Sequence, residues 1–143
     1  MPAGLTSLTF PLLSDNQLVS LTLPPDMTNL VLLLLDGNPL TTLVLPEPLA
    51  AINLADLTTS LNAQNVSVFT YPLTPQLVAP RQRGDGRFQF ALAAPPGVYV
   101  LLVSTNLDAW SELTVLTNQI GTFRFEDVAA RLSPQKFYQA RSF

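Results

Sequence analysis

The first half of the chain repeats a six-residue pattern of apolar residues at its first, fourth and sixth positions. The copies are Leu5–Phe10, Leu18–Leu23, Leu30–Leu35 and Leu40–Leu45. Because side chains alternate between the two faces of a strand, we expect Leu33 and Leu35 to face a core and Leu32 and Leu34 to face away from it. The copies start about 10 to 13 residues apart. This spacing predicts stacked coils in which two short strands make one repeat of roughly 22 residues.

The third copy continues through Asp36–Leu40, giving an unbroken LxxLxLxxNxL sequence, and Asn16-x-Leu18 is a weaker trace of the same ending. Asn38 falls where the chain leaves the strand. Its amide is therefore expected to bond backbone groups that have lost their ladder partners. The alternative is an unrelated pair of leucine-rich strands.

A helix followed by a strand is predicted after the leucine repeats. Leu54, Leu57 and Leu61 have helical spacing, with Asn53 as N-cap and Asp56 in the first turn. Residues Val66–Tyr71 alternate as a strand. These two elements would cap one end of a coil stack. At the other end no amphipathic cap precedes Leu5, Leu8 and Phe10.

The repeats resemble the bacterial leucine-rich repeats, and the resemblance covers Leu5 to about Ala50. It implies a short leucine-rich repeat solenoid, with one capping helix, that offers a sheet face to a protein partner.

The second half alternates apolar and polar residues in short runs separated by turns. Turn sequences are Gly84–Gly86, Ala94–Gly97 and Asn118–Gly121. The strands are expected at Leu77–Gln82, Arg87–Ala93, Val98–Thr105, Glu112–Thr117, Thr122–Glu126 and Lys136–Arg141. This spacing favours a small antiparallel β-sandwich of the immunoglobulin or fibronectin kind over residues 77–143.

Aromatic residues of this half are expected to fill its core, with Trp110 and Tyr138 among them. Ser104–Trp110 and Pro134–Arg141 also look like parts of a C-terminal β-sandwich found on long exported proteins of environmental bacteria, with Lys136 where that family commonly has arginine. The resemblance covers residues 76–143. It implies export and a surface-associated stalk or anchor.

Charge changes sharply along the chain. Residues 1–75 hold five acids and no Lys or Arg, whereas residues 76–143 hold seven bases and five acids. With the prolines at 72 and 75, this change predicts a repeat segment at 1–71, a linker at 72–76 and a β-sandwich at 77–143. No basic stripe could neutralise several phosphates, so nucleic acid is not an expected partner.

The chain contains no Cys and no His. It therefore lacks a thiol nucleophile, an imidazole base and soft metal ligands. Gly84-x-Gly86 fits a hairpin and not a phosphate loop, because a strand follows it. No Ser-x-x-Lys and no carboxylate pair in a recognisable context occurs, and the acidic turns have too few converging carboxylates for calcium. We expect neither an enzyme nor a bound cofactor or metal.

No signal peptide is recognisable at the N-terminus, and the longest apolar run, Leu30–Leu35, is too short to span a bilayer. The chain is either cytoplasmic or part of a longer exported protein. The resemblances favour an extracellular or cell-surface location without membrane insertion.

Three groups of residues are candidates for an interaction surface. The first is the outward-facing set on the repeats, where Leu32 and Leu34 replace the small residues of other copies, with Thr42 and Val44 as the next pair. The second is the uncapped end, and the third is a basic cluster around the Gly84–Gly86 hairpin. The uncapped end consists of Leu5, Leu8 and Phe10, and the basic cluster consists of Arg81, Arg83 and Arg87.

These surfaces predict a non-catalytic protein-interaction or display module. One alternative is a structural subunit that self-assembles head to tail, in rings or filaments, through the uncapped end. The other is a carbohydrate-binding module with Tyr99 or Trp110 as its platform.

Overall fold

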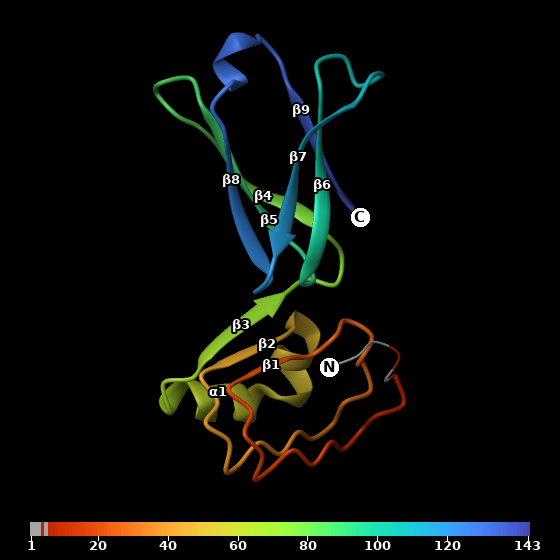
Figure 1. The fold of residues 1–143 in the computed structure, drawn as a ribbon, viewed down its shortest axis with the longest axis vertical. Coiled ribbons are helices and arrows are strands. Elements are labelled where there is room, and N and C mark those ends of the chain that lie inside the picture. Colours follow the sequence, from red (N-terminus) through yellow and green to blue (C-terminus); the bar gives the residue numbers. More distant parts are fainter. Residues whose placement is uncertain (1–3, 5) are drawn as a thin grey trace. The chain divides into compact units, whose positions relative to one another are not determined.

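The computed structural model describes Gly4 and residues 6–143 (Figure 1). The chain divides into two compact units, Met1–Leu73 and Thr74–Phe143, and the boundary falls within the expected linker at 72–76. Over these described residues the protein is mainly β, with one parallel sheet and two antiparallel sheets.

A three-stranded parallel sheet forms one side of the first unit. Its strands are β1 (Ser20–Thr22), β2 (Thr42–Pro46) and β3 (Ser67–Tyr71), in that order (Figure 1). Leu21 pairs with Leu43, 22 residues further on, and Leu43 pairs with Val68. The longer second step accommodates a π-helix, η1 (Leu49–Asn53), and an α-helix, α1 (Ala55–Ala63). The structure thus has a short parallel sheet where the sequence predicts a leucine-rich repeat solenoid.

The same 22-residue step recurs away from this sheet. Leu12 and Leu34 form a parallel β-bridge, in which Leu13 N donates to Leu34 O (3.0 Å) and Leu34 N donates to Pro11 O (3.3 Å). The segment in register with Leu30–Leu35 is therefore Leu8–Leu13, and not the predicted copy Leu5–Phe10. The prediction was three residues out of register because it followed the spacing of apolar residues, whereas the backbone hydrogen bonds fix the pairing.

Leucines form the core of the first unit, as predicted. Leu33 is 2% exposed and Leu35 is 6% exposed. Other buried members are Leu21, Leu23, Met27, Leu30, Leu43, Leu45, Leu49, Leu54, Leu61 and Val66. The hydroxyl of Tyr71, at the end of β3, donates to Leu23 O within this core.

Asn38 bonds backbone groups in a turn, which confirms the prediction made for it. Its side-chain nitrogen donates to Leu35 O in its own turn (2.8 Å) and to Leu13 O in the preceding coil (2.8 Å). Its side-chain oxygen accepts from Leu18 N (3.1 Å). One side chain therefore satisfies three backbone groups and fixes the stacking of two coils.

The predicted helix is present, but Asn53 is not its N-cap. Helix α1 begins at Ala55 after Leu54, which makes no capping side-chain bond, and Asp56 lies in its first turn. Asn53 closes η1, and its side chain donates to Leu30 O (2.6 Å). The Asn53 amide thus donates to the backbone of the neighbouring coil, whereas the sequence predicted that it would cap the helix.

The second unit contains two three-stranded antiparallel sheets, in the orders β4-β5-β8 and β7-β6-β9. All six predicted strands are found, with bounds that differ by at most one residue. They are β4 (Gln76–Gln82), β5 (Phe88–Ala93), β6 (Gly97–Ser104), β7 (Ser111–Asn118), β8 (Thr122–Asp127) and β9 (Phe137–Ser142). A 3₁₀-helix, η2 (Ala130–Leu132), precedes β9. Residues of both sheets share one core, which is consistent with the predicted β-sandwich.

Tyr138 packs against this core, but Trp110 is not among its buried or packed residues. The Tyr138 ring stacks on Phe88, with centroids 5.3 Å apart. Trp110 is half-buried in the loop after β6, where its indole nitrogen donates to Leu107 O (3.0 Å). The Ser104 hydroxyl and the Asn106 side chain accept backbone N–H groups of the same loop. The polar groups of Ser104–Trp110 are therefore used in building their own turn.

Candidate functional site

Four apolar side chains gather on one side of the first unit, away from its core. They are Phe10, Leu12, Leu32 and Leu34, and we call them the apolar strip. Phe10 is 58% exposed, Leu12 71% and Leu32 44%, while Leu34 is half-buried. Exposed apolar side chains are common singly, but a contiguous group marks a surface suited to binding.

Backbone hydrogen bonds hold the two segments of the strip side by side. Besides the bridge between Leu12 and Leu34, the N–H groups of Val31 and Leu32 donate to Thr9 O at 3.0 and 3.2 Å. Phe10 and Leu12 lie on either side of the buried Pro11, and Leu32 and Leu34 lie on either side of the buried Leu33. The backbone of the strip is therefore ordered by hydrogen bonds within the chain.

Sequence reasoning found three of the four residues. It singled out Leu32 and Leu34 as outward-facing, and Phe10 as part of an uncapped end. It missed Leu12, although Leu12 lies 22 residues before Leu34 and two after Phe10, a signal that the correct register would have given. Leu8 is half-buried and packs against the core, and Leu5 lies outside the described residues.

Thr42 and Val44 do not belong to this surface. Thr42 is half-buried, and Val44 is only 2% exposed. Val44 lies in the central strand β2, between Thr22 of β1 and Phe69 of β3. A central position gives it a cross-strand neighbour on each side, which the sequence pattern alone does not reveal.

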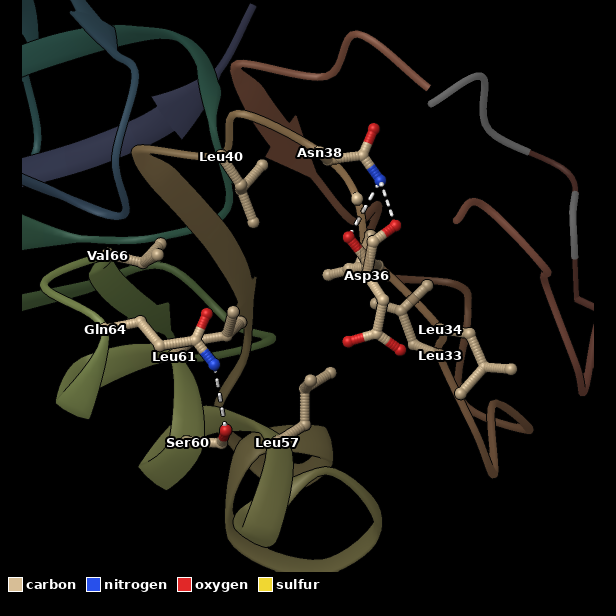
Figure 2. A pocket seen from close by; sticks show the side chains of 12 residues that line it. Leu33, Leu34, Asp36, Asn38, Leu40, Leu57, Ser60, Leu61, Gln64 and Val66 are labelled. Atoms are coloured by element: carbon tan, nitrogen blue, oxygen red, sulfur yellow. Dashed lines mark hydrogen bonds between the residues drawn. The ribbon is translucent and has the colours of Figure 1, made fainter. Parts of the chain in front are cut away.

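A cavity of about 170 Å³ adjoins the strip at Leu34 (Figure 2). Leu34 and Asp36 line it from the turn, and Leu57 and Gln64 line it from α1 and the residue that follows. Figure 2 shows Asp36 on one side of the space and the α1 residues on the other, with Gln64 bonded to Ser60 (3.2 Å).

The cavity arises because helix α1, and not a third coil with its own turn, follows the turn at Asn38. Strands stack about 4.8 Å apart, whereas a helix with its side chains is about 10 Å across. Helix α1 therefore cannot lie against the turn at Asp36–Asn38 as closely as the preceding coil does. The space is smaller than the roughly 300–1,000 Å³ of most small-molecule sites, and Asp36, Ser60 and Gln64 line it together with leucines.

Acidic groups flank the strip. Asp15 N donates to Asp36 O (2.7 Å), and both side chains are exposed. Gly37 lies against them with φ of 72°, and an added Cβ there would be 2.2 Å from Asp15 Oδ1. Since residues 1–75 contain no Lys or Arg, this surface is acidic and is complementary in charge to basic groups.

The three predicted arginines lie in the second unit, and two of them already have partners. Arg83 pairs with Glu126 (3.6 Å), and Arg87 pairs with Asp85 and with Glu126 (both 3.2 Å). Arg81 lines a separate cavity of about 210 Å³ on β4, which Arg124 of β8 also lines. The basic cluster of the sequence is therefore largely neutralised within its own sheet.

A buried polar cluster near the start of β9 has no counterpart in the sequence predictions. Asp127 Oδ2 accepts from Lys136 Nζ and from the Tyr138 hydroxyl (both 2.9 Å), and Asp127 Oδ1 accepts from Ala129 N (2.8 Å). Burial opposes ionisation of Asp127, but these hydrogen bonds outweigh it and hold its pKa below the usual range. Burial, followed by the bond to Asp127, raises the pKa of Tyr138 well above its usual value. The three side chains satisfy one another and join β8 to β9.

No group of three or more potential metal ligands occurs among the described residues. In that same part of the chain, no helix has the length and apolar character needed to cross a membrane. Comparison with known protein families, curated proteins and solved structures found no match to this chain.

Proposed function

We propose that the protein is a non-catalytic interaction module whose first unit binds a protein partner through the apolar strip. The observation that carries the proposal is the parallel pairing of residues 9–13 with residues 31–34, which brings Phe10 and Leu12 beside Leu32 and Leu34. The arrangement supports binding because hydrogen bonds order the backbone in advance, which lowers the entropic cost of association.

Hydrophobic burial can supply the affinity. Fully covering a leucine or phenylalanine side chain contributes roughly 1.5–3 kcal/mol. A few well-packed residues near the centre of an interface commonly provide most of its binding energy. The adjoining cavity gives one side chain of the partner a place to enter. Asp15 and Asp36 favour a partner that combines apolar and basic side chains.

The relationship to bacterial leucine-rich repeats forms part of the proposal. Its support is the 22-residue register, together with Asn16 and Asn38 at equivalent positions of successive turns. Asn16 donates to Leu13 O and Ser14 O, as Asn38 donates to Leu35 O and Asp36 O. On this reading the first unit is a short solenoid capped by α1 and β3.

The second unit would then be the domain that carries the partner-binding first unit. Its sheet orders, β4-β5-β8 and β7-β6-β9, suit an immunoglobulin or fibronectin type III sandwich. The resemblance to C-terminal sandwiches of exported bacterial proteins supports an extracellular or cell-surface location. The absence of His and Cys from the sequence, and the mutual bonding of Asp127, Lys136 and Tyr138, support a role without catalysis.

Self-assembly through the strip is the second candidate, because an apolar surface can also meet a second copy. The pairing of Arg83 and Arg87 within the second unit weakens the head-to-tail version, in which those arginines would meet acids of another copy. Carbohydrate binding has less support, since Trp110 is half-buried in its own loop and the Tyr99 hydroxyl donates to Pro95 O (2.8 Å).

The proposal is tested with a labelled synthetic peptide in which leucine and lysine alternate. Fluorescence anisotropy should show saturable binding to the wild-type chain, and Phe10→Ser/Leu32→Ser should weaken it about tenfold or more. Val19→Ser is the matched control, because Val19 is 55% exposed and is not in the strip. Equal binding by wild type and the double variant would overturn the proposal. Concentration-dependent dimers in sedimentation velocity that the double variant abolishes would favour self-assembly instead.

A further inference from the structure

Strand β9 is the last strand of its sheet, and one of its edges faces away from β6 (Figure 1). Phe143 N donates to Val98 O (3.0 Å), and β9 pairs with β6 without interruption from Phe137 to Ser142. In antiparallel pairing the hydrogen-bonded residues alternate. The backbone groups of Phe137, Gln139 and Arg141 therefore point to β6, and those of Tyr138, Ala140 and Ser142 point to the open edge. No strand among the described residues pairs with that edge.

The core of the second unit is open beside this edge. A cavity of about 250 Å³ lies between β4, β5 and β9, with Leu77, Phe88, Phe90 and Tyr138 among the residues lining it. The Tyr138 ring lies 5.3 Å from that of Phe88 and 5.1 Å from that of Phe90. A second cavity, of about 280 Å³, shares Phe88 and Tyr138 with the first. Aromatic core residues thus line a groove, although core residues are normally covered.

The strand across the groove is protected against strand addition, whereas β9 is not. The pairing of β4 with β5 shifts between Val78 and Arg81, and Ala79 has a φ of 51°. Pro80 lacks an N–H group. A bulge and a proline are usual ways of blocking an edge strand. Strand β9 has neither, and its free groups recur at every second residue.

We propose that β9 accepts an extended segment of another polypeptide as an added strand. Only an extended backbone presents donors and acceptors at the spacing of Tyr138, Ala140 and Ser142. Its inward side chains would be apolar and would enter the groove over Phe88 and Tyr138. Arg141 lies on the opposite face of β9, is exposed and makes no ion pair within the described part of the chain. An acidic residue of the added strand would face it.

This site is independent of the apolar strip. It lies in the other unit. The edge of β9 would bind the backbone of an apolar and acidic segment, whereas the strip would bind apolar and basic side chains. The two proposals can therefore fail separately.

The probe is a short labelled peptide of alternating valine and threonine with aspartate at both ends, titrated against the full chain. We expect saturable binding that Ala140→Pro weakens by about tenfold or more, because the N–H group of Ala140 faces the open edge. Since that group makes no bond to β6, circular dichroism should show the variant folded. Phe10→Ser/Leu32→Ser should bind the peptide as wild type does.

A second measurement leaves the protein unchanged. The same peptide with two successive N-methylated residues loses donors on both of its edges, so its binding should weaken by a similar factor. The proposal is overturned if the unmethylated peptide shows no saturable binding up to about 1 mM. It is also overturned if N-methylation leaves the affinity unchanged, or if folded Ala140→Pro binds as tightly as wild type.

Discussion

Leu12 and Leu34, 22 positions apart in the sequence, are partners in a parallel β-bridge. Their side chains lie on the side of the backbone opposite the buried Leu33 and Leu35. The bridge places them where Phe10 and Leu32 extend the same apolar surface. The proposed function depends on this register, so the residues that fix it are the first to test.

Asn38 should be the main polar determinant of the coil stacking. Asn38→Ala leaves Leu13 O, Leu35 O and Leu18 N without their side-chain partner, so it should destabilise the first unit by about 1–3 kcal/mol. Urea unfolding followed by circular dichroism measures this. Asn16→Ala is the control and should cost less, because Asn16 bonds only carbonyls of its own exposed turn. Equal losses from the two variants would contradict this role of Asn38.

Gly37 should be intolerant of any side chain. Its φ is 72°, and a Cβ would be 2.2 Å from Asp15 Oδ1 and 3.2 Å from Asp15 Cα. Gly37→Ala should therefore cost at least about 1 kcal/mol. Gly84→Ala is the matched control, since an added Cβ at Gly84 meets nothing within 4 Å. Wild-type stability of Gly37→Ala in urea unfolding would show that the turn is not held as described.

The Asp127 cluster should make the second unit sensitive to acid. Because the folded state lowers the pKa of Asp127, ionised Asp127 stabilises the fold above the usual carboxyl pKa of about 3.9. That contribution is lost as the pH falls through the lower folded value. The urea midpoint, followed by Trp110 fluorescence, should drop in this range for wild type. Asp127→Asn should lose that part of the dependence.

At neutral pH, Asp127→Asn should destabilise the second unit by about 3 kcal/mol, since Asp127 and Lys136 are 3% and 16% exposed. Glu126→Gln is the control. It breaks more exposed pairs with Arg83 and Arg87 and should cost less than about 1 kcal/mol. A flat wild-type profile between neutral pH and pH 3 would refute this role of Asp127.

Much of the fold follows from local sequence patterns. Turn residues such as Gly84–Gly86 and the alternation of Phe88 and Phe90 placed all six strands of the second unit. Helix α1 and strand β3 were also expected. These features depend on interactions between near neighbours, which a single sequence displays.

The errors concern long-range pairing. The six-residue pattern fits Leu5–Phe10 better than Leu8–Leu13, which has Pro11 at its fourth position. Only the backbone bonds between residues 11–13 and Leu34 select the second segment. Asn53 looked like a helix cap because its partner, Leu30 O, is distant in sequence. The burial of Val44 depends on neighbours in β1 and β3. Leu12 was missed from the candidate surface because the predicted register did not pair it with Leu34.

In the second unit, the polar groups were also misjudged because their partners are distant in the sequence. Arg83 and Arg87 looked like a free basic cluster until Glu126, 39 residues beyond Arg87, was placed beside them. Lys136 and Tyr138 were read as family motif residues, but their shared partner Asp127 comes from the end of β8.

Photo-cross-linking tests the binding role of the apolar strip most directly. The leucine–lysine peptide is made with one benzophenone-bearing residue, bound to the full chain and irradiated, and the adducts are located by mass spectrometry. The account predicts adducts on residues 10–12 and 31–34, which Phe10→Ser/Leu32→Ser removes and Val19→Ser leaves in place. Adducts spread evenly over both units, or confined to residues 74–143, would contradict it.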